Sequence, residues 1–374
     1  MILDTTDEQE LLVETSVRFM EAECPITRVR ELAEDPTGFD REWLRGGAEL
    51  GWFSLLVGEE HGGGSVSGRG LIDAVEVAEE IGRHVQPGPF LPMNVVAAAL
   101  ARRGSDDQRA DVLPALLAGE QVATWAPLDD AGRFDEGAGL VARRSAGRLT
   151  LSGSRGLVHD AHVAGWILVT ASLDGRPVQA LVATDTPGVR VRPRRCLDLA
   201  RRLSEVRFED VVLDEASVLG DPGGAPDELE DQLRQALVVQ CAETVGVMDA
   251  MFWRTVSYSK DRIAFGRPIG SFQALKHIMA DLGLWIENGR TATVAAAEAV
   301  HDQRDNAGQM ASMAAAYIGD MSVEVAQQSL QLHGGIGYTW EHDLHLFMRR
   351  VSVNRALYGD PAWHRERLCA LAGL

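Results

Sequence analysis

Apolar and polar positions divide the chain into three regions of different periodicity. In the first region apolar residues recur every three to four positions, which predicts helices over residues 11–20, 39–44 and 71–81. Residues 6–9 have the composition of a helix N-cap just ahead of the first of these helices. We therefore expect an all-α domain over residues 1–120.

Near residue 121 the helical period gives way to short runs with a period of two, separated by turn residues. These runs predict β-strands at residues 121–126, 149–153, 165–170, 178–183, 189–191 and 203–213. Short strands at such intervals favour an antiparallel β-barrel or sandwich. The glycine- and proline-rich residues 220–226 read as a linker that closes this domain, predicted over residues 121–226.

The helical period returns at about residue 229 and continues to the end of the chain. Long apolar stripes on successive helices with short links indicate an antiparallel four-helix bundle over residues 227–374. The stripes are Leu233, Leu237, Cys241, Val245, Met248 and Phe252; Leu275, Ile278, Met279, Leu282 and Ile286; and Met310, Met313, Tyr317, Met321 and Val325. The fold class is therefore α+β and multidomain.

Composition excludes several kinds of function. The chain has 374 residues and a formal net charge of −19, which argues against binding to nucleic acid or to an anionic membrane. Its four cysteines are widely separated, so neither a zinc site nor a disulfide framework is expected. The N-terminus is acidic without an apolar core, which predicts no signal peptide, and we expect no apolar run long enough to span a membrane. We expect a cytoplasmic protein with no metal site and no membrane span.

Two glycine-containing segments carry candidate chemistry. Residues 331–338, Gln-Leu-His-Gly-Gly-Ile-Gly-Tyr, force a tight turn between two helices and leave backbone N–H groups bare. Such a turn suits a phosphate or pyrophosphate, although a simple helix C-cap has the same composition. The second segment, Arg262-Ile263-Ala264-Phe265-Gly266 followed by Gln273, comes after another long helix.

Together these segments resemble the C-terminal flavin-binding signatures of the acyl-CoA dehydrogenase family, and the resemblance extends over essentially the whole chain. It implies FAD bound between the β domain of one subunit and the helical bundles of its own and a neighbouring subunit. It also implies six residues that hold the adenine-diphosphate half of the neighbour's flavin: Arg262, Phe265, Gln273, Gln331, Gly334 and Gly335. An arginine is suited to this role because its planar cation pairs with pyrophosphate.

The segments that would hold the flavin ring depart from the family pattern. Where the family has a TEPxxGSD loop, residues 125–133 read Trp-Ala-Pro-Leu-Asp-Asp-Ala-Gly-Arg. Where the family has a WIT segment against the isoalloxazine, this chain has Leu157-Val158-His159, without the aromatic residue or the threonine. We expect His159 to lie in an exposed loop.

The catalytic glutamate of the family is missing from both of its usual places. In the YEG segment, which here reads Tyr358-Gly359-Asp360, Gly359 stands in place of the glutamate, and the alternative position on the first bundle helix is Ala236. Asp360 and Glu243 lie nearest to these places and are the candidate replacements. Their simpler interpretation is a turn or cap residue for Asp360 and a packed or solvated helix carboxylate for Glu243.

This pattern resembles the non-catalytic subunit of actinobacterial α2β2 steroid-CoA dehydrogenases. The resemblance implies an acyl-CoA dehydrogenase partner that supplies the glutamate and the ring-binding loop, with an acyl-CoA thioester of a steroid side chain as substrate. Two alternatives stay open from the residues: a self-sufficient homotetrameric dehydrogenase that uses Asp360 or Glu243 as its base, and a non-enzymatic scaffold of the same fold.

Overall fold

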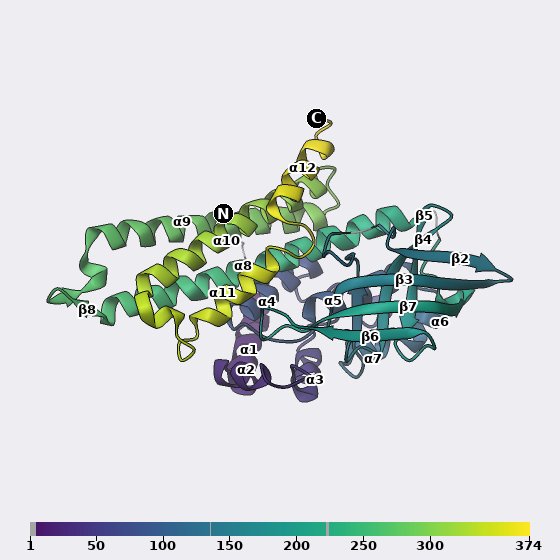
Figure 1. Cartoon of the computed structure of the whole chain (residues 1–374), viewed down its shortest axis with the longest axis horizontal. Helices are drawn as coiled ribbons and strands as arrows, with labels where there is room; N and C mark the ends of the chain where they lie inside the picture. The colour runs from purple at the N-terminus through teal and green to yellow at the C-terminus, as the bar shows by residue number, and fades with distance from the viewer. Residues whose placement is uncertain (1–4, 135, 222–223) are drawn as a thin grey trace.

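The computed structural model describes residues 5–134, 136–221 and 224–374 of the chain. N-terminal helices, a middle β sheet and a C-terminal helical bundle follow one another, so the fold class predicted from the sequence is confirmed (Figure 1). The helical bundle forms one end of the elongated molecule and the sheet forms the other. The predicted domain boundaries near residues 120 and 226 stay a prediction.

The N-terminal region consists of helices joined by short loops, except for the longer connection over residues 50–69, which contains the 3-10 helix η1 (Glu59–His61). Thr6 caps the first helix by accepting a hydrogen bond from the backbone of Gln9, as the N-cap prediction requires. The proline-rich residues 86–92 run directly into a helix, because proline is tolerated in a first turn. The helices are α1 (Asp7–Glu23), α2 (Ile26–Leu32), α3 (Arg41–Glu49), α4 (Gly70–Arg83), α5 (Phe90–Arg103), α6 (Asp106–Asp111) and α7 (Leu113–Leu117).

The middle region is one sheet with the strand order β1-β4-β2-β3-β7-β6, and β5 pairs with β4. The sheet is mixed, which corrects the antiparallel prediction: β1 and β2 each pair with β4 in parallel. The β2–β3 hairpin lies between β1 and β4 in the chain and provides the long connection that a parallel pair needs. The strands are β1 (Ala123–Ala126), β2 (Leu140–Ser145), β3 (Arg148–His159), β4 (Trp166–Leu173), β5 (Arg176–Ala183), β6 (Val189–Arg194) and β7 (Leu203–Asp214).

The C-terminal bundle is built on three long helices, and two shorter ones pack against them. Of the predicted linker, residues 222 and 223 lie outside the described residues, and the first long helix already begins at Ala225. A tight turn with the two-residue strands β8 and β9 joins the first two long helices. The elements are α8 (Ala225–Asp261), β8 (Ile263–Ala264), β9 (Arg267–Pro268), α9 (Gln273–His301), α10 (Ala307–His333), the 3-10 helix η5 (Gly334–Tyr338), α11 (Leu344–Asn354) and α12 (Pro361–Leu371).

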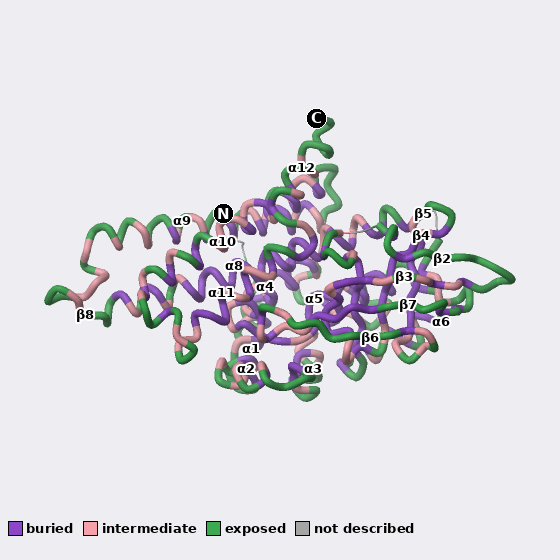
Figure 2. The backbone as a smooth tube through the Cα atoms, in the orientation of Figure 1, coloured by how far each residue is buried: buried purple, intermediate pink, exposed green. Residues whose placement is uncertain are grey.

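Helix α8 is the central helix of the molecule. By length and composition it could cross a membrane, which corrects the expectation that no stretch of the chain could. However, 89% of its most apolar window is buried inside the protein, as is typical of a core helix. Figure 2 shows this burial along α8, whereas the turn that carries β8 is exposed.

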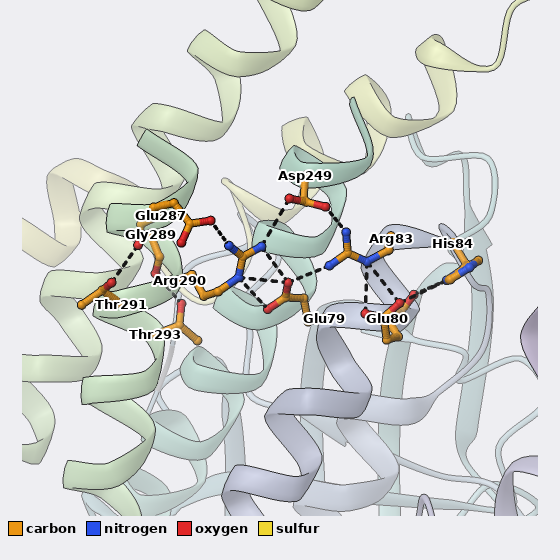
Figure 3. Close-up of polar contacts among 10 residues, drawn as sticks. All are labelled: Glu79, Glu80, Arg83, His84, Asp249, Glu287, Gly289, Arg290, Thr291 and Thr293. Atoms are coloured by element: carbon orange, nitrogen blue, oxygen red, sulfur yellow. Dashed lines mark hydrogen bonds and ion pairs between the residues drawn. The ribbon is translucent and has the colours of Figure 1, made fainter. Parts of the chain in front are cut away.

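A cluster of charged side chains joins α4 to the bundle (Figure 3). Glu79 of α4 accepts hydrogen bonds from Arg83, at 2.9 Å, and from Arg290 of α9, at 3.0 Å. Both arginines also contact the carboxylate of Asp249 on α8. The shared carboxylates hold the N-terminal helices against α8 and α9, because Glu79 and Asp249 each pair with both arginines.

Glu76 lies one turn before this cluster, beside a cavity of about 390 Å³. Burial, followed by repulsion from Glu79 and Glu80, raises the pKa of Glu76 from 4.5 to about 7. The folded protein therefore holds this proton more tightly than the unfolded chain does. Consequently the ionisation of Glu76 lowers the free energy of unfolding progressively as the pH rises from about 4.5 to 7. Above pH 7 the whole of this destabilisation is present.

The Glu76→Gln variant removes this pH-dependent loss. We expect it to be more stable than the wild type at pH 8 by about 2 kcal/mol, and to have no such advantage at pH 4. Urea-unfolding midpoints measured at both pH values test this expectation. Glu14→Gln, on the exposed side of α1, is the control, and an advantage of equal size at pH 4 and pH 8 would show that ionisation of Glu76 is not the cause.

Candidate functional site

Three side chains from the segments that would surround a flavin ring lie against one another. The indole of Trp125, in β1, stacks on the ring of Tyr358, which follows α11, with centroids 5.6 Å apart and planes 21° apart. The imidazole of His159, at the end of β3, lies 6.2 Å from the same tyrosine ring. All three residues are at most 5% exposed. The three segments therefore pack their rings on one another, and we call Trp125, His159 and Tyr358 the ring cluster.

His159 is buried, so the expectation that it lies in an exposed loop is wrong. It is the last residue of β3, and its carbonyl accepts a hydrogen bond from the hydroxyl of Thr124 in β1. Burial, followed by the positive charges of Arg201 and Arg350, holds the pKa of His159 well below its usual value, so the imidazole is neutral. The sequence pattern misjudged it because β3 continues past the irregularity in its pairing with β7 near residues 155–158.

Gly359, in the place of the family's glutamate, has a backbone that does not accommodate a larger residue. Its φ is +110°, and a Cβ atom there would lie 2.3 Å from the ring of Trp363. The neighbouring Asp360 caps α12 by accepting a hydrogen bond of 2.8 Å from the backbone N–H of Trp363. Asp360 is therefore a helix cap, which was the simpler interpretation of this residue, and its carboxylate is engaged in that cap.

Glu243 is buried on α8 between two arginines. Its carboxylate accepts hydrogen bonds from Arg201, at 2.7 and 2.9 Å, and from Arg350, at 2.6 Å. Burial by itself raises the pKa of Glu243, but the two guanidinium groups outweigh it and hold the pKa below its usual value. A carboxylate held in this way is a weak base. Ala236, the family's alternative position, is fully buried.

The partners of Glu243 extend into a network that joins all three regions of the chain. Arg350 of α11, only 1% exposed, also bonds to Asp198 in the loop after β6 and donates to the carbonyl oxygen of Gln86. Arg201 in turn donates to the side chain of Asn354 at the end of α11. No pattern in the sequence predicted this network. The available signal was Glu243, which lies between Cys241 and Val245 of an apolar helix. A buried carboxylate needs a cation as its partner, but the sequence does not identify which cation.

A small cavity lies next to Gly359. It has a volume of about 20 Å³ and is lined by Gln240, Asn354 and His364 among others. That volume accommodates a water molecule and is far too small for an acyl chain.

The six residues predicted to hold the nucleotide end of a flavin lie elsewhere, on the surface. Arg262 caps the C-terminus of α8, and Phe265, 94% exposed, lies in the turn between β8 and β9. Gln273 begins α9, and Gln331 is exposed in the last turn of α10. Gly334 and Gly335 follow at once, and no atom lies within 4 Å of where their Cβ atoms would be. Their backbone is therefore open to a ligand.

The ends of α8 and α10 lie side by side and bring these segments together. Tyr258, one turn before Arg262, stacks on His333 with ring centroids 4.6 Å apart. His333 directly precedes Gly334, and its Nδ1 lies 2.8 Å from the carbonyl oxygen of Ser329. The cation of Arg262, the exposed ring of Phe265 and the open backbone of Gly334 therefore lie at the same end of the bundle.

This surface and the ring cluster are far apart in the same chain. The amide of Gln240, on α8, donates to the carbonyl oxygen of Leu357, next to Tyr358. Arg262 lies about 33 Å farther along that helix, at 1.5 Å per residue. In Figure 1 the β8 turn and the sheet are accordingly at opposite ends of the molecule.

Comparison with known proteins gives consistent matches. Family models for the acyl-CoA dehydrogenase N-terminal and C-terminal domains match residues 6–120 and 229–370. Acyl-CoA dehydrogenase IpdE2 of Mycolicibacterium smegmatis is 30% identical, with 97% of this chain and 98% of the relative covered. Acyl-CoA dehydrogenase FadE34 of Mycobacterium tuberculosis is 33% identical over 87% of this chain and 41% of its own length.

Two solved structures of complexes are also similar. The ChsE4-ChsE5 complex from Mycobacterium tuberculosis contains a chain with a TM-score of 0.89 and 26% identity, covering 100% of this chain and 99% of its own. A variant of the steroid acyl-CoA dehydrogenase Tcur3481-Tcur3483 has a TM-score of 0.88 and 27% identity, covering 98% of both chains.

Proposed function

The chain belongs to the acyl-CoA dehydrogenase family, and we propose that it is the non-catalytic subunit of a heteromeric member, lending residues to an FAD whose ring lies in a partner subunit. The family is one of FAD-dependent oxidoreductases that act on CH–CH bonds. The observation that carries the proposal is the stack of Trp125 on Tyr358, closed by His159, in this chain's own ring site. A chain whose ring site is filled needs a partner for the chemistry.

The residues present fit one half of FAD and not the other. At the nucleotide end, Arg262 offers a planar cation to the pyrophosphate, and the open backbone of Gly334 and Gly335 permits close approach. At the ring end, buried side chains occupy the space, and no base is available at Gly359 or Ala236. Bound flavin supplies the hydride acceptor of the family's reaction, and this chain's part is to hold and orient its nucleotide end.

The surface around the nucleotide-end residues suits a protein partner. Large apolar side chains are exposed there, namely Phe265 at 94%, Tyr338 at 71% and Trp340 at 54%. Exposed apolar groups gathered at one end of a protein are typical of an interface. Because two similar structures are complexes named for two acyl-CoA dehydrogenase chains, we propose a cytoplasmic α2β2 assembly with a second such subunit. The steroid dehydrogenase among them supports an acyl-CoA thioester of a steroid side chain as substrate.

The alternatives have less support. A homotetramer with its own base would use Asp360 or Glu243, but the first caps α12 and the second is held by two arginines. A scaffold without cofactor gives no reason for the open glycine backbone beside Arg262. Each alternative makes a distinct prediction, namely turnover by the chain alone, or no flavin in any assembly.

Flavin stoichiometry tests the proposal directly. The chain is purified alone and together with an acyl-CoA dehydrogenase encoded beside it, and visible spectra give the ratio of FAD to chain. We expect no flavin in the chain alone and one FAD for each pair of unlike chains in the complex. Stoichiometric FAD in the chain alone, with reduction of ferricenium by an acyl-CoA, would contradict the proposal.

Restoring the family's glutamate should not restore a site. We expect Gly359→Glu to be destabilised by roughly 2–4 kcal/mol, because a positive φ and contact with Trp363 both oppose a side chain there. Thermal unfolding midpoints measure this, and Gly175→Glu, at a similarly positive φ but with no atom near its Cβ position, isolates the backbone contribution. Acyl-CoA oxidation by the Gly359→Glu chain alone would show that the ring site can open.

A further inference from the structure

A third cavity lies away from both the ring cluster and the nucleotide-end residues. It is a groove of about 550 Å³ between the α1–α2 corner, the end of α4, the face of α8 and the start of α11. We call it the α8 groove. Its apolar lining comprises Cys24, Pro25, Ile26, Ala250, Trp253 and Phe347. This size and composition are typical of small-molecule sites.

An exposed aromatic side chain forms one wall of the α8 groove. Trp253 is 58% exposed, although its neighbours along α8, Ala250 and Met251, are buried. Phe347 of α11 is fully buried behind this lining, and Pro25 and Ile26 form the facing wall. An apolar body placed between Trp253 and that wall would remove the indole face from water, which is favourable in proportion to the area covered.

One cation in the α8 groove has no hydrogen-bond partner among the described residues. The guanidinium of Arg254 lies over the ring of Phe347, 4.8 Å from its centroid. Its nearest carboxylate, that of Asp343, is 3.8 Å away and already accepts a hydrogen bond of 2.7 Å from Arg30. Burial lowers the pKa of Arg254, and Asp343 only partly opposes this.

The other titratable groups of the groove either have partners within the protein or carry a negative charge. Arg83 bonds to Glu79 and Glu80 and contacts Asp249, so its charge is balanced. The Nδ1 atom of His84 lies 2.9 Å from the carbonyl oxygen of Glu80. Glu21 is exposed, 3.8 Å from the other ring nitrogen of that histidine. Arg254 is therefore the cation available to a ligand.

We propose that the α8 groove binds an amphipathic monocarboxylate, with its carboxylate on Arg254 and its apolar body between Trp253 and the Pro25–Ile26 wall. A guanidinium pairs with a carboxylate through two parallel hydrogen bonds, which supplies the partners that Arg254 lacks. A CoA thioester is disfavoured, because its several phosphates would face Glu21 and Asp343. The body is a linear chain or a fused-ring skeleton. This site does not depend on the proposed subunit role.

Calorimetric titration of the purified full-length chain tests the proposal with three probes below their micelle-forming concentrations. Decanoate represents a linear acid, cholate a fused-ring acid, and decanamide a neutral chain of the same length as decanoate. We expect one site per chain for at least one of the two acids. We expect Arg254→Leu to weaken carboxylate binding by roughly 10- to 100-fold and to leave decanamide binding unchanged.

Two further variants separate the site from adsorption elsewhere. Trp253→Ala should weaken the binding of both acids and of decanamide by a similar factor, because it removes an apolar wall of the groove without changing the charge. Arg349→Leu, which removes a cation from α11 outside the groove lining, should change nothing. The proposal is overturned if the folded wild type binds neither acid saturably, or if Arg254→Leu, with an unchanged circular dichroism spectrum, keeps wild-type affinity. Neither result bears on the FAD content of the heteromer.

Discussion

Replacing Arg350 by methionine is expected to lower the free energy of unfolding by about 3–5 kcal/mol, which is near the upper end for a single substitution. The side chain is only 1% exposed and bonds to Asp198 and Glu243 at once. Methionine would leave the Asp198 carboxylate without this partner and Glu243 with Arg201 alone. An unpaired buried carboxylate has a large desolvation cost, and the apolar contacts of the methionine side chain do not compensate for it.

Arg349→Met is the matched control for this prediction. Arg349 is the preceding residue of the same helix, and it donates a hydrogen bond of 3.2 Å to the carbonyl oxygen of Leu197 in an exposed contact. Its replacement should shift the urea-unfolding midpoint only slightly, since exposed polar contacts contribute little. Equal shifts for the two variants would show that the Asp198–Arg350–Glu243 network does not hold α11 in place.

Replacing Arg262 by leucine is expected to weaken FAD binding by the heteromer roughly 10- to 100-fold, because a charge-assisted pair with the pyrophosphate is lost. The fold of the chain should be unaffected, since Arg262 is exposed at the end of α8. Flavin absorbance after gel filtration measures the loss. Activity measured without added FAD should fall in parallel, and excess FAD should restore it.

Two further variants show whether the effect arises from the pyrophosphate contact. Arg262→Lys should be intermediate, because an ammonium group keeps the charge but not the bidentate geometry. Arg365→Leu removes an exposed arginine of α12 that pairs with Asp320 of α10, and this variant should retain FAD. If Arg262→Leu retains FAD as well as Arg365→Leu does, this chain does not lend its arginine to the partner's cofactor.

The local pattern of the chain was sufficient to predict the order and type of its main elements. A stripe such as Leu233, Leu237 and Cys241 follows from helix geometry within a few turns, and these residues are buried as expected. The missing glutamate at Gly359 could also be read directly from the residues. The parallel pairing of β1 with β4 could not, because alternation in one strand carries no information about the direction of its neighbour.

What the sequence determined by itself is the division into helices, sheet and bundle, together with the segments that place the chain in its family. Only the tertiary structure showed that Trp125 stacks on Tyr358, that His159 is buried beside them and that Arg350 reaches Asp198. These partners are far apart along the chain. Periodicity reports only on neighbours within a turn or a strand, whereas burial and charge pairing depend on which distant segments the fold brings together.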